Sequence, residues 1–98
     1  MKVKTKSGFV CNVNENKIKD WRYVRAAANA ARATNDANAI ADVVFMIHFL
    51  LGDEEEARLI EHVTGKDGIA DSALMQQEFS EITRLMGEEI KKSNSSQA

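Results

Sequence analysis

Residues 40–63, IADVVFMIHFLLGDEEEARLIEHV, decide the fold predicted for this chain. In the first half of this stretch, apolar residues recur at spacings of three and four, the period of an α-helix. The stripe consists of Ile40, Val43, Val44, Ile47 and Leu51. Other apolar residues cover the remaining sides, which is typical of a helix at the centre of a fold or in an interface. Gly52 is a suitable C-cap. Acidic residues follow it, as favoured at a helix start. The stretch therefore predicts two helices, over residues 36–51 and 54–64.

The residues before this stretch predict a β-hairpin and one more helix. Between residues 2 and 13, apolar and polar residues alternate on both sides of Gly8, which is typical of a hairpin. Asn14 or Asn16 can cap a helix over residues 16–33. The apolar stripe of that helix, which we expect to face the core, is Ile18, Trp21, Val24, Ala28 and Ala31.

The residues after it predict a turn, a last helix and a polar tail. Gly65 to Gly68 form the turn, and Asp71 or Ser72 caps a helix over residues 72–91. Its stripe is Met75, Phe79, Ile82, Met86 and Ile90. Residues 93–98 are polar and are predicted to be disordered. The fold class is therefore α+β and mostly α-helical: one domain, residues 1–92, with an N-terminal β-hairpin followed by about four helices.

The composition is that of a small globular domain. The chain has 98 residues, of which 44% are hydrophobic and 29% charged, both near the globular average. No apolar run approaches the roughly 20 residues that span a bilayer. The residues after Met1 alternate, unlike a signal segment, so we expect a cytoplasmic protein without membrane contact. A single cysteine, Cys11, excludes an internal disulfide framework and a multi-cysteine zinc site.

Charge is distributed unevenly along the chain. Residues 1–35 carry eight basic and two acidic residues, a net charge of +6, whereas the rest carries five basic and 13 acidic residues, a net charge of −8. This polarity suits either a basic binding surface or head-to-tail self-association. The candidate basic surface consists of Lys4, Lys6, Lys17, Lys19, Arg22 and Arg25. A small phage-encoded regulator that binds nucleic acid through this surface is the alternative function. We interpret Trp21 as a core residue, which leaves Tyr23 as a thin stacking platform.

The titratable residues do not form a recognisable catalytic or metal-binding pattern. His48 lies in the most apolar helix and is interpreted as a core or interface residue. His62 is interpreted as a surface residue. His62 and the adjacent Glu61 point to different sides of a helix, and zinc needs three or four convergent ligands. Cys11 is interpreted as a small buried hydrophobe. We expect no enzyme activity, metal or cofactor; a pocket that gathers both histidines with acidic groups would change this expectation.

Five short segments, in order along nearly the whole chain, carry a family resemblance. They are residues 2–11 (KVKTKSGFVC), 14–23 (NENKIKDWRY), 49–55 (FLLGDEE), 60–63 (IEHV) and 66–69 (KDGI). Together they resemble the small tail assembly chaperones of long-tailed bacteriophages and prophages. The chain departs from that pattern in its alanine-rich, basic first helix and in Ala70, where the family usually has proline.

The resemblance implies a non-catalytic assembly factor. Such a chaperone binds the tape measure protein and assists polymerisation of the tail tube protein in the host cytoplasm, and is absent from the mature virion. A frameshifted longer product occurs in many phages. The apolar stripes and charge polarity fit this role, and we expect a homo-oligomer. If a client groove exists, its contacts are predicted to lie in the second and last helices, although the same residues would also serve a core. Its predicted contacts are Phe45, Phe49, Met75, Phe79 and Met86.

Overall fold

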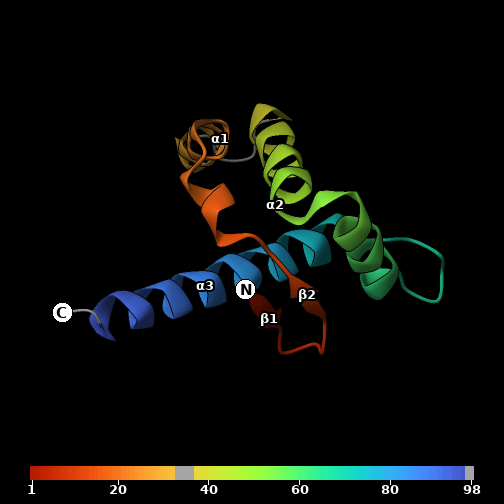
Figure 1. Cartoon of the computed structure of the whole chain (residues 1–98). Coiled ribbons are helices and arrows are strands. Elements are labelled where there is room, and N and C mark those ends of the chain that lie inside the picture. The colour runs from red at the N-terminus through yellow and green to blue at the C-terminus, as the bar shows by residue number, and fades with distance from the viewer. Residues whose placement is uncertain (33–36, 97–98) are drawn as a thin grey trace.

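The computed structural model describes residues 1–32 and 37–96, and most of them are helical (Figure 1). The elements are β1 (Lys2–Lys4), β2 (Val10–Asn12), the 3-10 helix η1 (Glu15–Lys19), α1 (Trp21–Arg32), α2 (Ala37–Val63) and α3 (Ser72–Ser96). The predicted class, mostly helical with an N-terminal β-hairpin, is confirmed. The described residues form three α-helices where about four were predicted.

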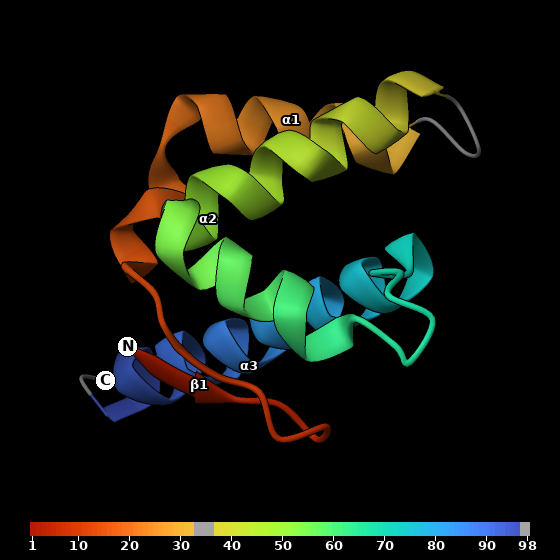
Figure 2. The same cartoon turned by 90° about the vertical axis from the view of Figure 1, so that its right-hand side faces the viewer.

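The helices form two layers that meet at a bend in α2. Figure 2 shows α1 lying antiparallel beside the first half of α2, with the second half of α2 and α3 below them. We call α1 together with residues 37–51 of α2 the arm. We call the hairpin, residues 53–63 of α2 and α3 the base. The two halves of α2 therefore belong to different layers.

The hairpin is confirmed and forms one wall of the base. Its strands pair antiparallel with Val3 opposite Cys11. Alternation turns one face of residues 1–13 inward, because successive strand residues point to opposite sides. The inward residues are Val3, Thr5, Phe9, Cys11 and Val13, all buried. The backbone N–H of Lys6 donates to Glu81 of α3, and that of Asn12 donates to Glu55 of α2, each at 2.8 Å.

The predicted helix over residues 16–33 is interrupted. Its described part consists of η1 and α1, separated by Asp20 in an extended conformation (φ −67°, ψ 133°); residue 33 lies outside the described residues. Asp20 caps α1, since its Oδ1 accepts from the backbone N–H of Arg22 at 2.8 Å. Asn14 caps η1 in the same way, accepting from the N–H of Asn16 at 3.0 Å.

This interruption changes which face of α1 is buried. Because η1 has about three residues per turn and Asp20 is extended, the helical phase assumed from Ile18 onward is lost. The inward face consists of Tyr23, Ala26, Ala27 and Ala30, and its small alanines let α1 and α2 approach closely. The predicted stripe is wrong, because Trp21, Val24, Ala28 and Ala31 are exposed.

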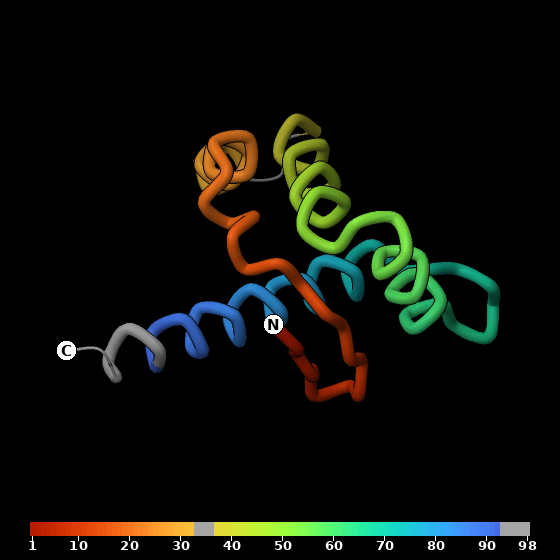
Figure 3. The backbone as a smooth tube through the Cα atoms, viewed as in Figure 1, coloured from red at the N-terminus to blue at the C-terminus, as the bar shows by residue number. Residues whose placement is uncertain are grey.

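The two helices predicted over residues 36–51 and 54–64 are the two halves of α2. Gly52 joins them with φ 79° and ψ 171°, a region that essentially only glycine adopts, and the backbone turns there (Figure 3). The buried residues of α2 are Met46, Ile47, Leu50, Leu51, Leu59 and Val63. Ile40 and Val44 of the predicted stripe are exposed. Residue 36 and the helix break expected around residues 34–36 lie outside the described residues.

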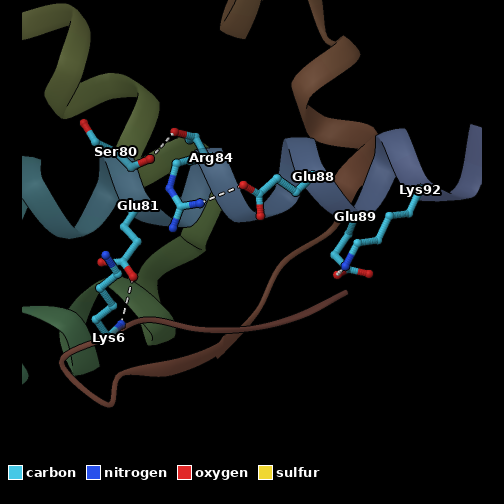
Figure 4. A network of polar contacts seen from close by, with 8 residues as sticks. Lys6, Ser80, Glu81, Arg84, Glu88, Glu89 and Lys92 are labelled. Carbon is cyan, nitrogen blue, oxygen red and sulfur yellow. Dashed lines mark hydrogen bonds and ion pairs between the residues drawn. The ribbon is translucent and has the colours of Figure 1, made fainter.

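The last helix is confirmed at its start and is longer than predicted at its end. Asp71 caps α3, its Oδ1 accepting from the N–H of Ala73 at 2.7 Å. Residues 93–96 are helical, where a disordered tail was predicted, and residues 97–98 lie outside the described residues. Ion pairs along the exposed face support the end of the helix, with Arg84 to Glu88 at 2.8 Å and Lys92 to Glu89 at 3.4 Å (Figure 4).

The tightest packing is in the base and at its junction with the arm. The most deeply buried large side chains are Leu50, Leu59, Ile82, Met86 and Cys11. The interpretation of Cys11 as a buried small residue is confirmed, and burial raises the pKa of its thiol to about 11. Among the helices of residues 1–32 and 37–96, none is long and apolar enough to cross a membrane.

Candidate docking groove

An apolar groove of about 290 Å³ lies between the arm and the base. The first half of α2 supplies one wall, and Ile60, the link before α3 and the start of α3 supply the other. The apolar lining consists of Ile40, Val43, Val44, Ile47, Ile60, Ala70 and Met75, and the polar lining of Glu56, Ser72 and Gln76. Ile40, Val44 and Ile60 are exposed. Exposed aliphatic side chains in a concave site are typical of a binding surface.

Two local structures position the walls of the groove. The bend at Gly52 turns the second half of α2 back toward the first, which brings Ile60 toward the wall that carries Ile47. After α2, the N–H of Gly65 donates to the carbonyl of Ile69 at 3.0 Å, and Thr64 forms an isolated antiparallel β-bridge with Ala70. This closed turn places Ala70 and the start of α3 at the edge of the groove.

A pair of ionic contacts spans the bend. His48 Nδ1 lies 2.9 Å from Glu56 Oε1, and its Nε2 lies 3.4 Å from Asp53 Oδ1. The hydrogen bond to Glu56, followed by the charges of Glu56 and Asp53, raises the pKa of His48, and the charge of Lys17 opposes this rise. His48 is 55% exposed, so it is not a core residue; its interpretation as an interface residue stays a prediction. Glu56 contacts His48 and also lines the groove.

The groove lies between the second and last helices but uses few of the predicted contact residues. Met75 lines it, whereas Phe79 and Met86 are buried in the base. Phe45 and Phe49 stack with ring centroids 5.5 Å apart, and Phe49 packs against Tyr23 of α1. The exposed wall consists instead of Ile40, Val44 and Ile60. Sequence periodicity had placed Ile40 and Val44 in an apolar stripe, but it left open whether that stripe faces a core or an interface.

The candidate basic residues do not form one free surface. Lys17 Nζ donates to the carbonyl of Phe49 at 3.1 Å. The Arg22 guanidinium lies over the Phe49 ring and donates twice to Asp20, at 3.0 and 2.9 Å. Hydrogen bonds from Arg22 lower the pKa of Asp20 to about 2. The other four are exposed: Lys4 and Lys6 belong to the hairpin, and Lys19 and Arg25 to the segment around Trp21.

A polar cluster joins the tip of the hairpin to α2 and α3. Ser7 Oγ lies 2.9 Å from His62 Nε2 and donates to Glu78 Oε1, while the buried Glu78 Oε2 has no partner. A second cavity of about 390 Å³ lies beside it, against Phe9, Arg58 and His62. In a nucleophilic triad the histidine lies between serine and carboxylate. Here the serine lies in the middle, so the cluster serves as a tether.

The two histidines lie at different sites, His48 at the bend and His62 at the hairpin. Within residues 1–32 and 37–96, no group of three or more His, Cys, Asp or Glu side chains could hold a metal ion. This chain matches no protein-family model, no curated protein and no solved structure. The apolar groove is therefore the feature from which a function can be argued.

Proposed function

We propose that this protein is a tail assembly chaperone that holds an apolar helical segment of a tape measure protein in the groove. One observation supports this most: the groove is open and lined mainly by aliphatic side chains, three of them exposed. An amphipathic helix binds such a groove through apolar residues spaced three and four apart. The proposal requires protein–protein contacts alone, without a chemical step.

The lining suits clients of varied sequence. Aliphatic contacts are non-directional, and Met75 adds a flexible thioether that adapts to different shapes. Glu56, Ser72 and Gln76 offer polar partners to a client backbone or side chain. A groove of this kind would keep an apolar helix in solution without selecting one exact sequence.

The nucleic-acid alternative has weaker support from the geometry. Its basic residues are split between the hairpin and the α1 region, and Lys17 and Arg22 contact Phe49 and Asp20 of their own chain. Phosphate binding through several cations would give steep salt dependence. A DNA titration between low and high salt tests this alternative, and no binding at low salt would contradict it.

The chaperone proposal is tested by co-expression with the tape measure protein encoded in the same phage or prophage gene cluster. The wild type should raise the soluble fraction of that protein. Ile40→Asp, which places a carboxylate in the groove, should abolish this effect. Ile69→Asp is the matched control, because Ile69 is exposed to a similar degree (62% against 56%) and does not line the groove. Equal solubility with both variants, or no effect of the wild type, would contradict the proposal.

A further inference from the structure

We infer that Trp21 of one copy of this chain inserts into the groove of a second copy, so that the copies associate head to tail. The inference goes beyond the chaperone proposal, since it concerns the protein on its own. It rests on three observations: an unusually exposed tryptophan, a groove of matching size and polarity, and complementary charges around the two.

Trp21 is the largest exposed apolar residue of the described chain. It is the only tryptophan, begins α1 and is 71% exposed. Val24, Ala28 and Ala31 continue the exposed apolar strip along α1. Tryptophan is highly buried on average, and exposed tryptophans are enriched among the anchors of protein interfaces. The exposed indole of Trp21 is therefore a suitable anchor for binding an apolar groove.

The groove is large enough for an indole. A cavity of roughly 150 Å³ binds benzene, and the volume here is about 290 Å³. The walls contributed by Ile40, Val44, Ile60 and Met75 are apolar, as the ring requires. The carboxylate of Glu56 in the lining can accept the indole N–H, the one polar group that a buried tryptophan must satisfy.

The charges around the two surfaces are opposite. Lys19 and Arg25 lie on either side of Trp21 in the sequence, and both are exposed. Glu56 lines the groove, and Asp71 precedes its Ser72. At the scale of the chain, residues 1–35 carry a net charge of +6 and the remainder −8. Such charge complementarity orients the two copies as they meet and disfavours encounters that bring like charges together.

The two surfaces belong to different elements: Trp21 begins α1, whereas α2, the link after it and the start of α3 line the groove. In Figure 2, α1 begins on the left, whereas the start of α3, which lines the groove, is on the right. One contact therefore uses Trp21 of one copy and the groove of the other, leaving one of each free. A contact of this heterologous type repeats into rings or filaments.

The first experiment is sedimentation velocity of the purified protein over a concentration series, with tryptophan fluorescence recorded in parallel. Association should increase with concentration, and the emission should shift to shorter wavelength as Trp21 leaves water. Trp21→Ala should weaken association about 30-fold or more, as for an interface anchor, and Ile40→Asp should do the same. Leu74→Ala and Ile69→Asp, at exposed positions outside the groove lining, should behave as wild type. Circular dichroism confirms that each variant is folded.

The second experiment mixes Trp21→Ala with Ile40→Asp. The first variant keeps an intact groove and the second an intact tryptophan, so the mixture should form dimers of one copy each and nothing larger. Absence of wild-type association, or association unaffected by Trp21→Ala, would overturn the inference. Loss of DNA binding in Trp21→Ala with unchanged association would also overturn it, in favour of the nucleic-acid alternative. All measurements lack a tape measure protein, so this inference and the chaperone proposal can fail independently.

Discussion

The arm and the base are built from similar residues but pack differently. In the base, the hairpin, the second half of α2 and α3 enclose side chains such as Leu59 and Ile82 completely. In the arm, α1 contributes a single buried residue, Ala26, while Trp21, Val24, Ile40 and Val44 remain exposed. The base buries most of its apolar residues, although Ile60 and Leu74 are exposed; the arm buries one side of α2 and presents much of its remaining apolar surface to solvent.

This difference indicates that the base mainly stabilises the fold, whereas the arm is available for binding; we call this the division between the two regions. Burial of apolar surface is the main stabilising contribution to folding, so the base should dominate the free energy of unfolding. The exposed residues of the arm contribute little to that free energy and are available to a partner. The predictions below test this division, beginning with the largest expected effect.

Truncation of a base residue should have the largest effect. Leu59 is 0% exposed, and Leu59→Ala should lower the free energy of unfolding by about 2–5 kcal/mol, through lost burial and the cavity left behind. Leu74→Ala, at an exposed leucine, is the matched control, and Val44→Ala reports on the arm. Both should change it by less than about 0.5 kcal/mol. Urea unfolding followed by circular dichroism measures all three, and a Val44→Ala effect as large as that of Leu59→Ala would refute the division.

The bend between the two regions should be the next most sensitive position. A Cβ at Gly52 would meet no atom within 4 Å, so the cost of Gly52→Ala is that of its backbone conformation. Because L-residues rarely adopt φ 79° with ψ 171°, we expect a loss of about 1–3 kcal/mol. Gly87→Ala, inside α3 with equally open space, should instead gain about 0.5–1 kcal/mol.

Urea unfolding measures both variants. If the bend depends on the glycine conformation, the free energy of unfolding should fall in Gly52→Ala and rise in Gly87→Ala. A stable Gly52→Ala variant would show that α2 has another way to turn, and the groove could then no longer be attributed to this residue. Gly52→Ala should also weaken the self-association through the groove, because the bend at Gly52 positions the two walls of the groove relative to each other.

Much of the fold could be predicted from the sequence, because its elements depend on local patterns. Alternation around Gly8 predicted the hairpin, Asp71 predicted the start of α3, and Gly52 marked the division of α2. The apolar stripe of α3 was also identified, although Phe79 and Met86, predicted as client contacts, are buried together with Ile82. In each case the signal lies within a few residues of the feature that it predicts.

The candidate site could be predicted only in outline. Client contacts in the second and last helices were expected, but the orientation of each helix depends on tertiary contacts that periodicity does not carry. Around α1, alanines lie on several sides, so the pattern could not distinguish the close-packed face from the one that includes Trp21. In α2, nearly every position from Val43 to Leu51 is apolar, and a stripe could not identify the exposed aliphatic residues.

The smallest predicted effect concerns the pH dependence of the arm. The contacts to Glu56 and Asp53 raise the pKa of His48 above its ordinary value of 6.5. A histidine whose pKa is raised by folding stabilises the folded state fully below its unfolded pKa. That contribution disappears as the pH rises through the folded pKa. The contacts across the bend should therefore weaken from about pH 6.5 upward, and the effect should be small because His48 is largely exposed.

Hydrogen exchange and the NMR titration of His48 can separate the two regions in this pH window. After correction for the intrinsic pH dependence of exchange, amides of residues 37–51 should lose protection as His48 becomes neutral, while those of the base, including Cys11, should not. His48→Gln should remove the pH dependence of the arm, whereas His62→Gln should keep it, because His62 contacts Ser7 and Phe9 of the hairpin. Equal loss of protection in both regions would mean that the bend does not separate them. Since Glu56 also lines the groove, a response confined to the arm would link the protonation of His48 to the binding surface.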